Sequence, residues 1–301
     1  MTQLILYFFL TALFTHLFFG ILISNKGNNN LLDIYDHPNE RKIHKSKILK
    51  IGGIVILFSS LLMLTFYRLL NDESIFKMTV AETHLFMSTV FLVLGALFDD
   101  LIGINAPKKL FFQVIAIAIL INSGYVFTLF YSNIINIVLT VCLFILIINS
   151  MNLIDGIDGL SSSIFILFAI FMIAISLKFL IVDPKYYILS SIFLGSISSF
   201  LLLNFPPAKV FLGDTGSQLL GWIVAVSIIY FSSFLQFNCQ KIYLLSFISL
   251  PFYDVSFVMI KRFLIQSGGL SKRIFGIVKP DQNHIHHLIL SSGLSPYRAM
   301  I

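Results

Sequence analysis

The sequence predicts an all-α protein, a polytopic bundle of transmembrane helices whose N-terminus lies outside the cell. Of its 301 residues, 57% are hydrophobic and 11% are charged, whereas a soluble domain has about 45–50% apolar and about 25% charged residues. Its apolar runs are roughly 15–22 residues long, about the length of a helix that crosses a bilayer. They lack the alternation over about 10 residues that is typical of transmembrane strands. No stretch is long enough for a separate soluble domain, so residues 1–301 are expected to form one membrane domain.

The apolar runs, taken in order, predict nine spans. They are expected at about residues 3–23, 51–70, 84–98, 110–130, 134–149, 160–182, 187–204, 216–236 and 241–263. The first is not a signal peptide, because no basic segment precedes it and no A-x-A cleavage pattern follows it. The last residues, Ser295–Ile301, resemble the first turns of a tenth helix. The final helix of the bundle is therefore expected to be missing from this chain.

The third and fifth predicted spans look short. About 15 residues of helix reach only about 22 Å, which is less than the roughly 30 Å thickness of the hydrocarbon core. The polar segments that follow these spans, Asp99-Asp100 and Asn149–Asp158, are therefore expected to be recessed at the rim of the membrane.

The basic residues predict the orientation. When the apolar runs are threaded alternately, most of the 20 lysines and arginines fall on one side. The exceptions are Arg68, Lys77, Lys178, Lys185 and Lys241. The positive-inside rule makes the richer side cytoplasmic. The basic residues are scattered through loops without forming a stripe, so the net charge of +6 does not indicate a nucleic-acid partner.

Two adjacent acids, Asp99 and Asp100, end the third predicted span. Adjacent carboxylates repel each other and need a cation or a raised pKa, and a helix C-terminus disfavours negative charge. One acid could bind Mg²⁺ while the other accepts a proton. The alternative interpretation is a solvated helix end.

A second polar segment follows the fifth predicted span. Asn149, Asn152, Asp155 and Asp158 recur every third residue. They form one drifting stripe if the segment is helical, or a loop whose N–H groups can bind phosphate if the glycines break the helix. Alternatively, Asp158 caps the sixth span.

A third acid, Asp214, opens the eighth predicted span within the segment Phe211–Ser217. Helix N-termini attract phosphates, so Asp214 is either an N-cap or a metal ligand that holds a cation against a diphosphate. All these acids are expected at the same, cytoplasmic end of the bundle.

A cluster of histidines, His284, His286 and His287, follows the ninth span. It lacks cysteine or acidic partners at the spacing of a zinc site, so hydrogen bonding or proton donation to phosphate is the preferred interpretation. An inert surface cluster is the alternative. The further basic candidates are Arg41, His44, Lys108 and Lys109. These could bind phosphates or act only as positive-inside anchors.

Taken together and in order, these segments resemble the polyprenyl-phosphate N-acetylhexosamine-1-phosphate transferases, closer to the WecA-type branch than to the MraY-type branch. The segments that carry the resemblance are Asp36–His44, Gly52-Gly53, Asp99-Asp100, Asn149–Leu160, Phe211–Ser217 and His284–His287. The resemblance implies transfer of N-acetylhexosamine 1-phosphate from a UDP-sugar to undecaprenyl phosphate, with release of UMP, at the inner membrane of a bacterium. This would be the first membrane step of a cell-surface polysaccharide pathway.

The resemblance also implies roles for the site residues. Asp100, Asn152 and Asp214 would hold Mg²⁺ (or Mn²⁺), and Asp99, Asp100 and His284 would take part in the proton chemistry. The substrates would contact Asn149, Asp155, Asp158, Lys108, Lys109, His286, His287, Arg41 and His44. The oligomeric state is left open between a monomer and a homodimer.

Two other functions fit part of the pattern. An ion-coupled transporter would carry its acids near the bilayer midplane on broken helices, whereas these acids lie at one end. An aspartate-rich prenyltransferase would pair D-x-x-x-D clusters, and Asp99-Asp100 has no second acid at that spacing.

Overall fold

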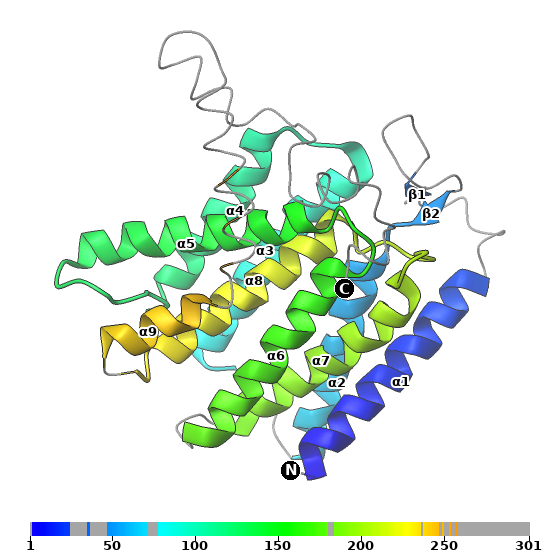
Figure 1. The fold of residues 1–301 in the computed structure, drawn as a ribbon, viewed down its shortest axis with the longest axis horizontal. Helices are drawn as coiled ribbons and strands as arrows, with labels where there is room; N and C mark the ends of the chain where they lie inside the picture. Colours follow the sequence, from blue (N-terminus) through cyan, green and yellow to red (C-terminus); the bar gives the residue numbers. More distant parts are fainter. Residues whose placement is uncertain are drawn as a thin grey trace, which may run out of the picture.

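The computed structural model describes residues 2–24, 35–36, 47–71, 78–179, 184–235 and 237–246, together with positions 249, 253 and 257. Its helices are α1 (Thr2–Ser24), α2 (Gly52–Leu70), α3 (Val80–Ile102), α4 (Ala106–Ile121), α5 (Asn133–Ile154), α6 (Leu160–Phe179), α7 (Pro184–Asn204), α8 (Gly213–Ser232) and α9 (Asn238–Leu245). Two short strands, β1 (Tyr35–Asp36) and β2 (Ile48–Leu49), pair antiparallel beside the start of α2 (Figure 1).

Seven of these helices are long and apolar enough to cross a membrane: α1, α2, α3, α5, α6, α7 and α8. This confirms an all-α polytopic bundle and makes the chain a multi-pass membrane protein. One face of α1 carries exposed apolar side chains such as Phe9 and Leu17, as expected of a helix that faces lipid.

The predicted fourth span, 110–130, is wrong in its extent. Helix α4 ends at Ile121, and Gly124 adopts a positive φ of 84° just after it. The chain then forms a loop that is fixed to α5, because Asn136 and Thr140 accept hydrogen bonds from backbone N–H groups of Leu129, Phe130 and Phe127. Of the predicted ninth span, the structure describes a continuous helix only as far as Leu245.

The expectation that the third and fifth spans are short is also wrong. Helix α3 has 23 residues and α5 has 22. A capping box starts α3 at polar residues, since the side chain of Thr79 accepts from the N–H of Glu82 and the Glu82 carboxylate accepts from the N–H of Thr79. At their other ends both helices continue through the polar motifs, so the motifs are not recessed by a short helix.

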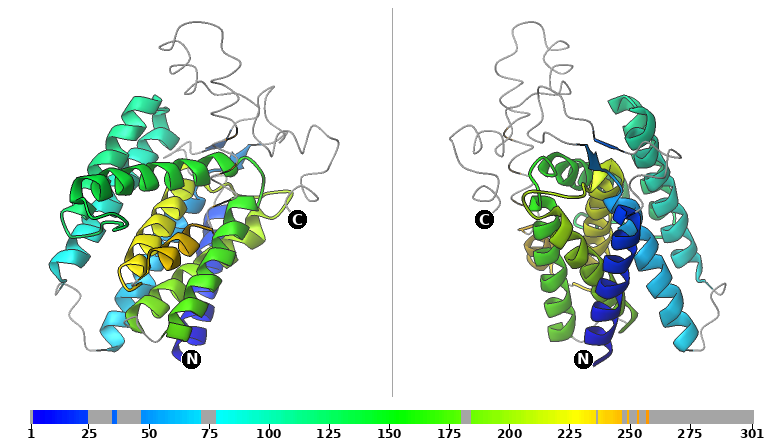
Figure 2. Two further views of the ribbon diagram at one scale, coloured as in Figure 1. Left: turned by 60° about the vertical axis from the view of Figure 1, so that its left-hand side comes forward. Right: turned by 90° about the vertical axis from the view of Figure 1, so that its right-hand side faces the viewer.

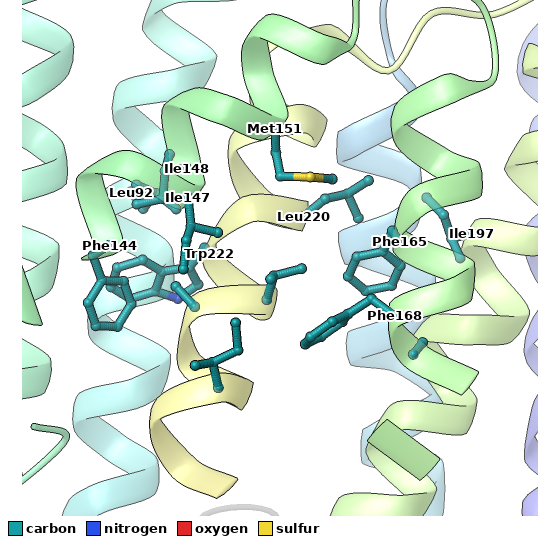
Figure 3. Close-up of a cluster of buried hydrophobic side chains, with 14 of the residues drawn as sticks. Leu92, Phe144, Ile147, Ile148, Met151, Phe165, Phe168, Ile197, Leu220 and Trp222 are labelled. Carbon is teal, nitrogen blue, oxygen red and sulfur yellow. The ribbon is translucent and has the colours of Figure 1, made fainter. Parts of the chain in front are cut away.

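Helix α8 is the central helix of the bundle, with 78% of its spanning stretch buried, against 22% for α1. It lies against α2, α3 and α5 (Figure 2). Trp222 packs on Phe144 with the ring centroids 4.9 Å apart, and its indole N–H donates to Thr89 Oγ1 at 3.0 Å. Figure 3 shows Trp222, Phe144 and Leu92 in this core. Trp222 thereby joins α3 and α5 to α8.

The helices run alternately up and down, so the polar motifs meet at one end of the bundle. The C-terminal ends of α3 and α5 lie there with the N-terminal ends of α4 and α8 (Figures 1 and 2). The sequence prediction that these segments share one end is confirmed by contacts between Asp100 and Asp214 and between Asn152 and Asp214.

Candidate active site

The start of α8 is joined to the start of α2 by backbone hydrogen bonds. The N–H groups of Gly52 and Gly53 donate to the carbonyls of Phe211 and Leu212 at 3.0 and 2.9 Å. A Cβ on Gly53 would lie only 2.2 Å from the backbone nitrogen of Gly216. The two helices approach so closely that only glycine fits, which gives the Gly52-Gly53 pair a structural reason.

Asp100 caps α8 from a neighbouring helix. Its Oδ1 accepts from the N–H of Asp214 at 2.9 Å, and its Oδ2 accepts from the N–H and the hydroxyl of Thr215 at 2.8 and 2.7 Å. Lys50 adds an ion pair at 3.1 Å, and the Asp100 side chain is only 1% exposed. A carboxylate is stabilised at this position by the free N–H groups and the dipole of the helix.

The cap changes two expectations. Asp214 is not the N-cap of α8, since it lies in the first turn and Leu212 precedes the helix. Asp100 was expected to hold a cation, but its two oxygens already accept from Asp214, Thr215 and Lys50. The Asp99 and Asp214 side chains are more exposed, at 7% and 25% against 1% for Asp100, and are the candidates to bind a cation. Asp99 Oδ1 also accepts from the N–H of Ile104 at 2.9 Å.

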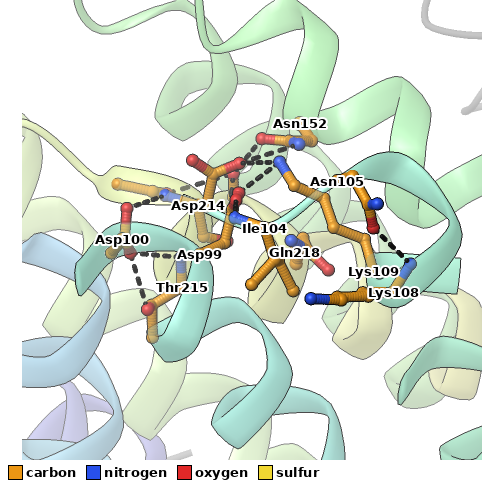
Figure 4. Close-up of polar contacts among 12 residues, drawn as sticks. Asp99, Asp100, Ile104, Asn105, Lys108, Lys109, Asn152, Asp214, Thr215 and Gln218 are labelled. Atoms are coloured by element: carbon orange, nitrogen blue, oxygen red, sulfur yellow. Dashed lines mark hydrogen bonds and ion pairs between the residues drawn. The ribbon is translucent and has the colours of Figure 1, made fainter. Parts of the chain in front are cut away.

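Four side chains form a charged layer at the end of the bundle, which we define as Asp99, Lys109, Asn152 and Asp214 (Figure 4). The Lys109 ammonium pairs with Asp99 Oδ2 and lies 3.4 Å from Asp214 Oδ1. The amide of Asn152 donates to the same Asp214 oxygen at 3.1 Å. Burial alone would lower the pKa of Lys109, but the carboxylates of Asp214 and Asp99 raise it above its ordinary value. The ammonium therefore stays charged.

An amide layer, which we define as Gln113, Asn149 and Gln218, lies one helical turn deeper. Gln113 Nε2 donates to Gln218 Oε1 at 3.1 Å, and Asn149 Nδ2 donates to Gln113 Oε1 at 3.0 Å. Among the described residues, Gln218 Nε2 has no hydrogen-bond partner. Each amide sits three or four residues from a member of the charged layer on the same helix, so the two layers are stacked. Asn149 belongs to this deeper layer, and its contact with substrate stays a prediction.

The turn after α5 brings two further acids beside the charged layer. The helix carries Asn149 and Asn152 and ends before Asp155, so the segment is part helix and part turn. Asp155 accepts from the Ser161 hydroxyl at 2.5 Å. Desolvation raises the pKa of Asp155 to about 8; the Ser161 hydrogen bond opposes this, and the charges of Asp214, Asp158 and Asp100 add to it. Asp158 accepts from the N–H of Ala208 at 3.0 Å.

The structure thus brings together five of the residues that the sequence predicts for the site, and each of them contacts at least one of the others. These are Asp99, Asp100, Lys109, Asn152 and Asp214. Lys108 is exposed beside them. Arg41, His44, His284, His286 and His287 lie outside the described residues.

Several residues of the site were missed by sequence reasoning. These are Lys50, Gln113, Thr215, Ser217 and Gln218. Gln113 and Gln218 carried a usable signal, because each is a lone amide four residues beyond a charged candidate in an otherwise apolar run. Ser217 donates to Asn152 Oδ1 at 2.7 Å and so orients that amide.

The charged layer fits a small divalent cation. Within the described ranges no group of three or more histidine, cysteine, aspartate or glutamate side chains could hold a metal. Mg²⁺, however, is usually held by one or two carboxylates together with water and substrate phosphates. Asp99 and Asp214 supply two such carboxylates, and the Lys109 ammonium already lies between them. Asn152 turns its N–H to Asp214 and its carbonyl oxygen to Ser217, so that oxygen would have to turn to join the carboxylates.

Comparison with known proteins agrees with this geometry. The model of glycosyl transferase family 4 matches residues 83–232, which contain the charged and amide layers. A probable undecaprenyl-phosphate N-acetylglucosaminyl 1-phosphate transferase of Bacillus subtilis is 33% identical over 109 residues, covering 36% of this chain and 28% of that protein.

Two further relatives carry similar names. An undecaprenyl-phosphate alpha-N-acetylglucosaminyl 1-phosphate transferase of Thermotoga maritima is 35% identical over 94 residues, covering 31% of this chain and 28% of that protein. The transferase of the same name from Haemophilus influenzae is 28% identical over 291 residues, covering 90% of this chain and 76% of that protein. The first two matches thus span little more than a quarter of those relatives' length.

Proposed function

The chain belongs to glycosyl transferase family 4 by its match over residues 83–232, and we propose that it transfers N-acetylhexosamine 1-phosphate from a UDP-sugar to undecaprenyl phosphate, releasing UMP. The observation that carries this proposal is the charged layer. In it, carboxylates from two separate helices, Asp99 and Asp214, both contact the Lys109 ammonium. The names of the relatives support undecaprenyl phosphate as acceptor and N-acetylglucosamine as the sugar.

The reaction exchanges one phosphoanhydride for another, so its barrier is the repulsion between an anionic acceptor and an anionic diphosphate. Bound Mg²⁺ would neutralise the phosphates and align the in-line attack. Asp214, Asn152 and Asp99 would hold the ion. Asp99, paired with Lys109, is the group that would orient or accept the proton of the lipid phosphate.

The bundle supports the same assignment on physical grounds. A polyprenyl acceptor needs an apolar environment beside a polar reaction centre, and the charged layer lies at the end of membrane-spanning helices. The ion-coupled transporter is disfavoured, because its acids would lie near the midplane. We place the site on the cytoplasmic face of the plasma membrane, where Lys50, Lys108 and Lys109 would satisfy the positive-inside rule.

The direct test is an assay of the purified protein in detergent with undecaprenyl phosphate, Mg²⁺ and a panel of UDP-sugars. The expected products are UMP and a lipid-linked diphosphate sugar in equal amounts, with N-acetylglucosamine as the preferred sugar. Asp214→Asn should abolish both products without preventing membrane insertion. If no UDP-sugar yields UMP, or if Asp214→Asn releases UMP at the wild-type rate, the proposal is wrong.

A further inference from the structure

Lys109 occupies an unusual position, because its ammonium group lies between the two carboxylates that would hold the metal. We propose that Lys109 is a resident counter-ion: its ammonium pairs with Asp99 and Asp214 before the metal binds, and it leaves them for the substrate diphosphate when the metal arrives. This inference rests on the proposed function for the identity of the metal and the diphosphate.

The first argument is charge balance. Asp99 is 7% exposed and Asp214 is 25% exposed, and they come from different helices, α3 and α8. Two partly buried carboxylates close to one cation would repel each other without it. Lys109 contacts both carboxylates and therefore lets α3 and α8 pack together in the metal-free protein.

The second argument is that the two cations exclude each other. Mg²⁺ binds carboxylate oxygens at about 2.0–2.1 Å, so it would approach the same two carboxylates that Lys109 now contacts. An ammonium and a divalent ion in contact with the same oxygens would also repel each other strongly. We therefore expect the metal to displace Lys109 from at least one of its two contacts.

The third argument is that Lys109 can move without moving its helix. It lies in the first turn of α4 (Ala106–Ile121), its side chain is 26% exposed, and a lysine has a flexible four-carbon stem. After release, its ammonium remains next to the metal, where a diphosphate would collect. One side chain thus serves the empty site and the substrate complex in turn, which favours binding of the metal before or together with the diphosphate.

Lys108 offers a matched control. It is the neighbouring residue with the same charge, it is exposed, and no ion pair of its side chain is present among the described residues. Lys108→Met therefore removes the same charge from the same helix turn without freeing the carboxylates.

The test is Mn²⁺ binding to the purified protein without substrates, measured from the electron paramagnetic resonance signal of free Mn²⁺. Lys109→Met should tighten Mn²⁺ binding by about fivefold or more, since a competing ion pair is removed. Lys108→Met should change it by less than about twofold, because an exposed charge is screened. Mn²⁺ should also raise the melting temperature of Lys109→Met more than that of the wild type.

Binding of the diphosphate gives the second readout. Lys109→Met should raise the KM for the UDP-sugar although it binds Mn²⁺ more tightly. The inference is overturned if Lys109→Met binds Mn²⁺ no more tightly than the wild type, if Lys108→Met tightens binding equally, or if no variant binds Mn²⁺. If the Mn²⁺ results hold but no UDP-sugar is turned over, the proposed function fails instead.

Discussion

Asp100 accepts hydrogen bonds from two N–H groups in the first turn of α8, those of Asp214 and Thr215. The acid that ends one membrane helix therefore sets the position of the acid that begins another. Gly213, with a φ of 77°, makes the close approach possible, since a Cβ there would lie 3.0 Å from Asp100 Oδ2. Asp100 is a positioning residue for Asp214.

Asp100→Asn should lower both stability and turnover, because one amide oxygen replaces two charged acceptors and Lys50 loses its partner. The loss of a helix cap costs about 0.5–2 kcal/mol. Thermal unfolding in detergent and UMP release measure the two effects. Thr215→Val should act through the same hydrogen bond, so the double variant should lose less than the sum of the single variants. Additive losses, or lost turnover at unchanged stability, would favour a direct ligand role for Asp100.

Gly53→Ala should destabilise the protein, because the new methyl group would meet the backbone of Gly216 at 2.2–2.3 Å. Backbone cannot move aside as a flexible side chain does, so the cost should reach or exceed about 1–3 kcal/mol. Gly20→Ala is the matched control, since nothing lies within 4 Å of a Cβ at Gly20 and alanine favours helix. Equal melting temperatures for Gly53→Ala and the wild type would contradict the proposed close contact of α2 and α8.

The common location of the acids could be predicted from the sequence, whereas their separate roles could not. Alternating apolar runs place every second loop on the same side of the membrane, which was enough to bring Asp100 and Asp214 to one end. Neighbouring residues on a helix, however, point about 100° apart. Asp99 therefore faces Lys109 while Asp100 faces the start of α8, and only the packing of the helices decides which acid does which.

The helix ends were the least predictable part of the fold. Hydropathy ends the third span at Phe98, because it counts Asp99 and Asp100 as too polar for the membrane. In the structure α3 continues to Ile102, since both carboxylates find donors inside the protein. The amide layer escaped prediction for a related reason: Gln113 and Gln218 are polar residues whose partners lie on other helices.

The amide layer predicts unequal effects of two substitutions, and a smaller than additive effect of their combination. Gln113→Leu should be the more damaging, because it removes the partner of the Gln218 carbonyl and one of the two acceptors of the Asn149 amide, at a cost of about 1–3 kcal/mol. Gln218→Leu should cost less, since its Nε2 makes no hydrogen bond among the described residues. The double variant should cost less than the sum, as measured by thermal unfolding in detergent. Independent, additive losses would mean that these amides do not act as one network.

Asp155 predicts a pH dependence of stability whose sign follows from its pKa of about 8, raised from 3.8 mainly by desolvation. The folded protein holds this proton more tightly than the unfolded chain, so this carboxyl lowers the stability progressively as the pH rises from about 4 to about 8, and no further above that range. Asp155→Asn lacks the penalty, so its melting temperature relative to the wild type should increase between about pH 5 and pH 8. Ser161→Ala removes the hydrogen bond that opposes the shift, and it should extend the wild-type decline to higher pH. A difference between Asp155→Asn and the wild type that stays constant with pH would mean that Asp155 is ionised throughout, because only a proton held in the folded state makes the two curves diverge.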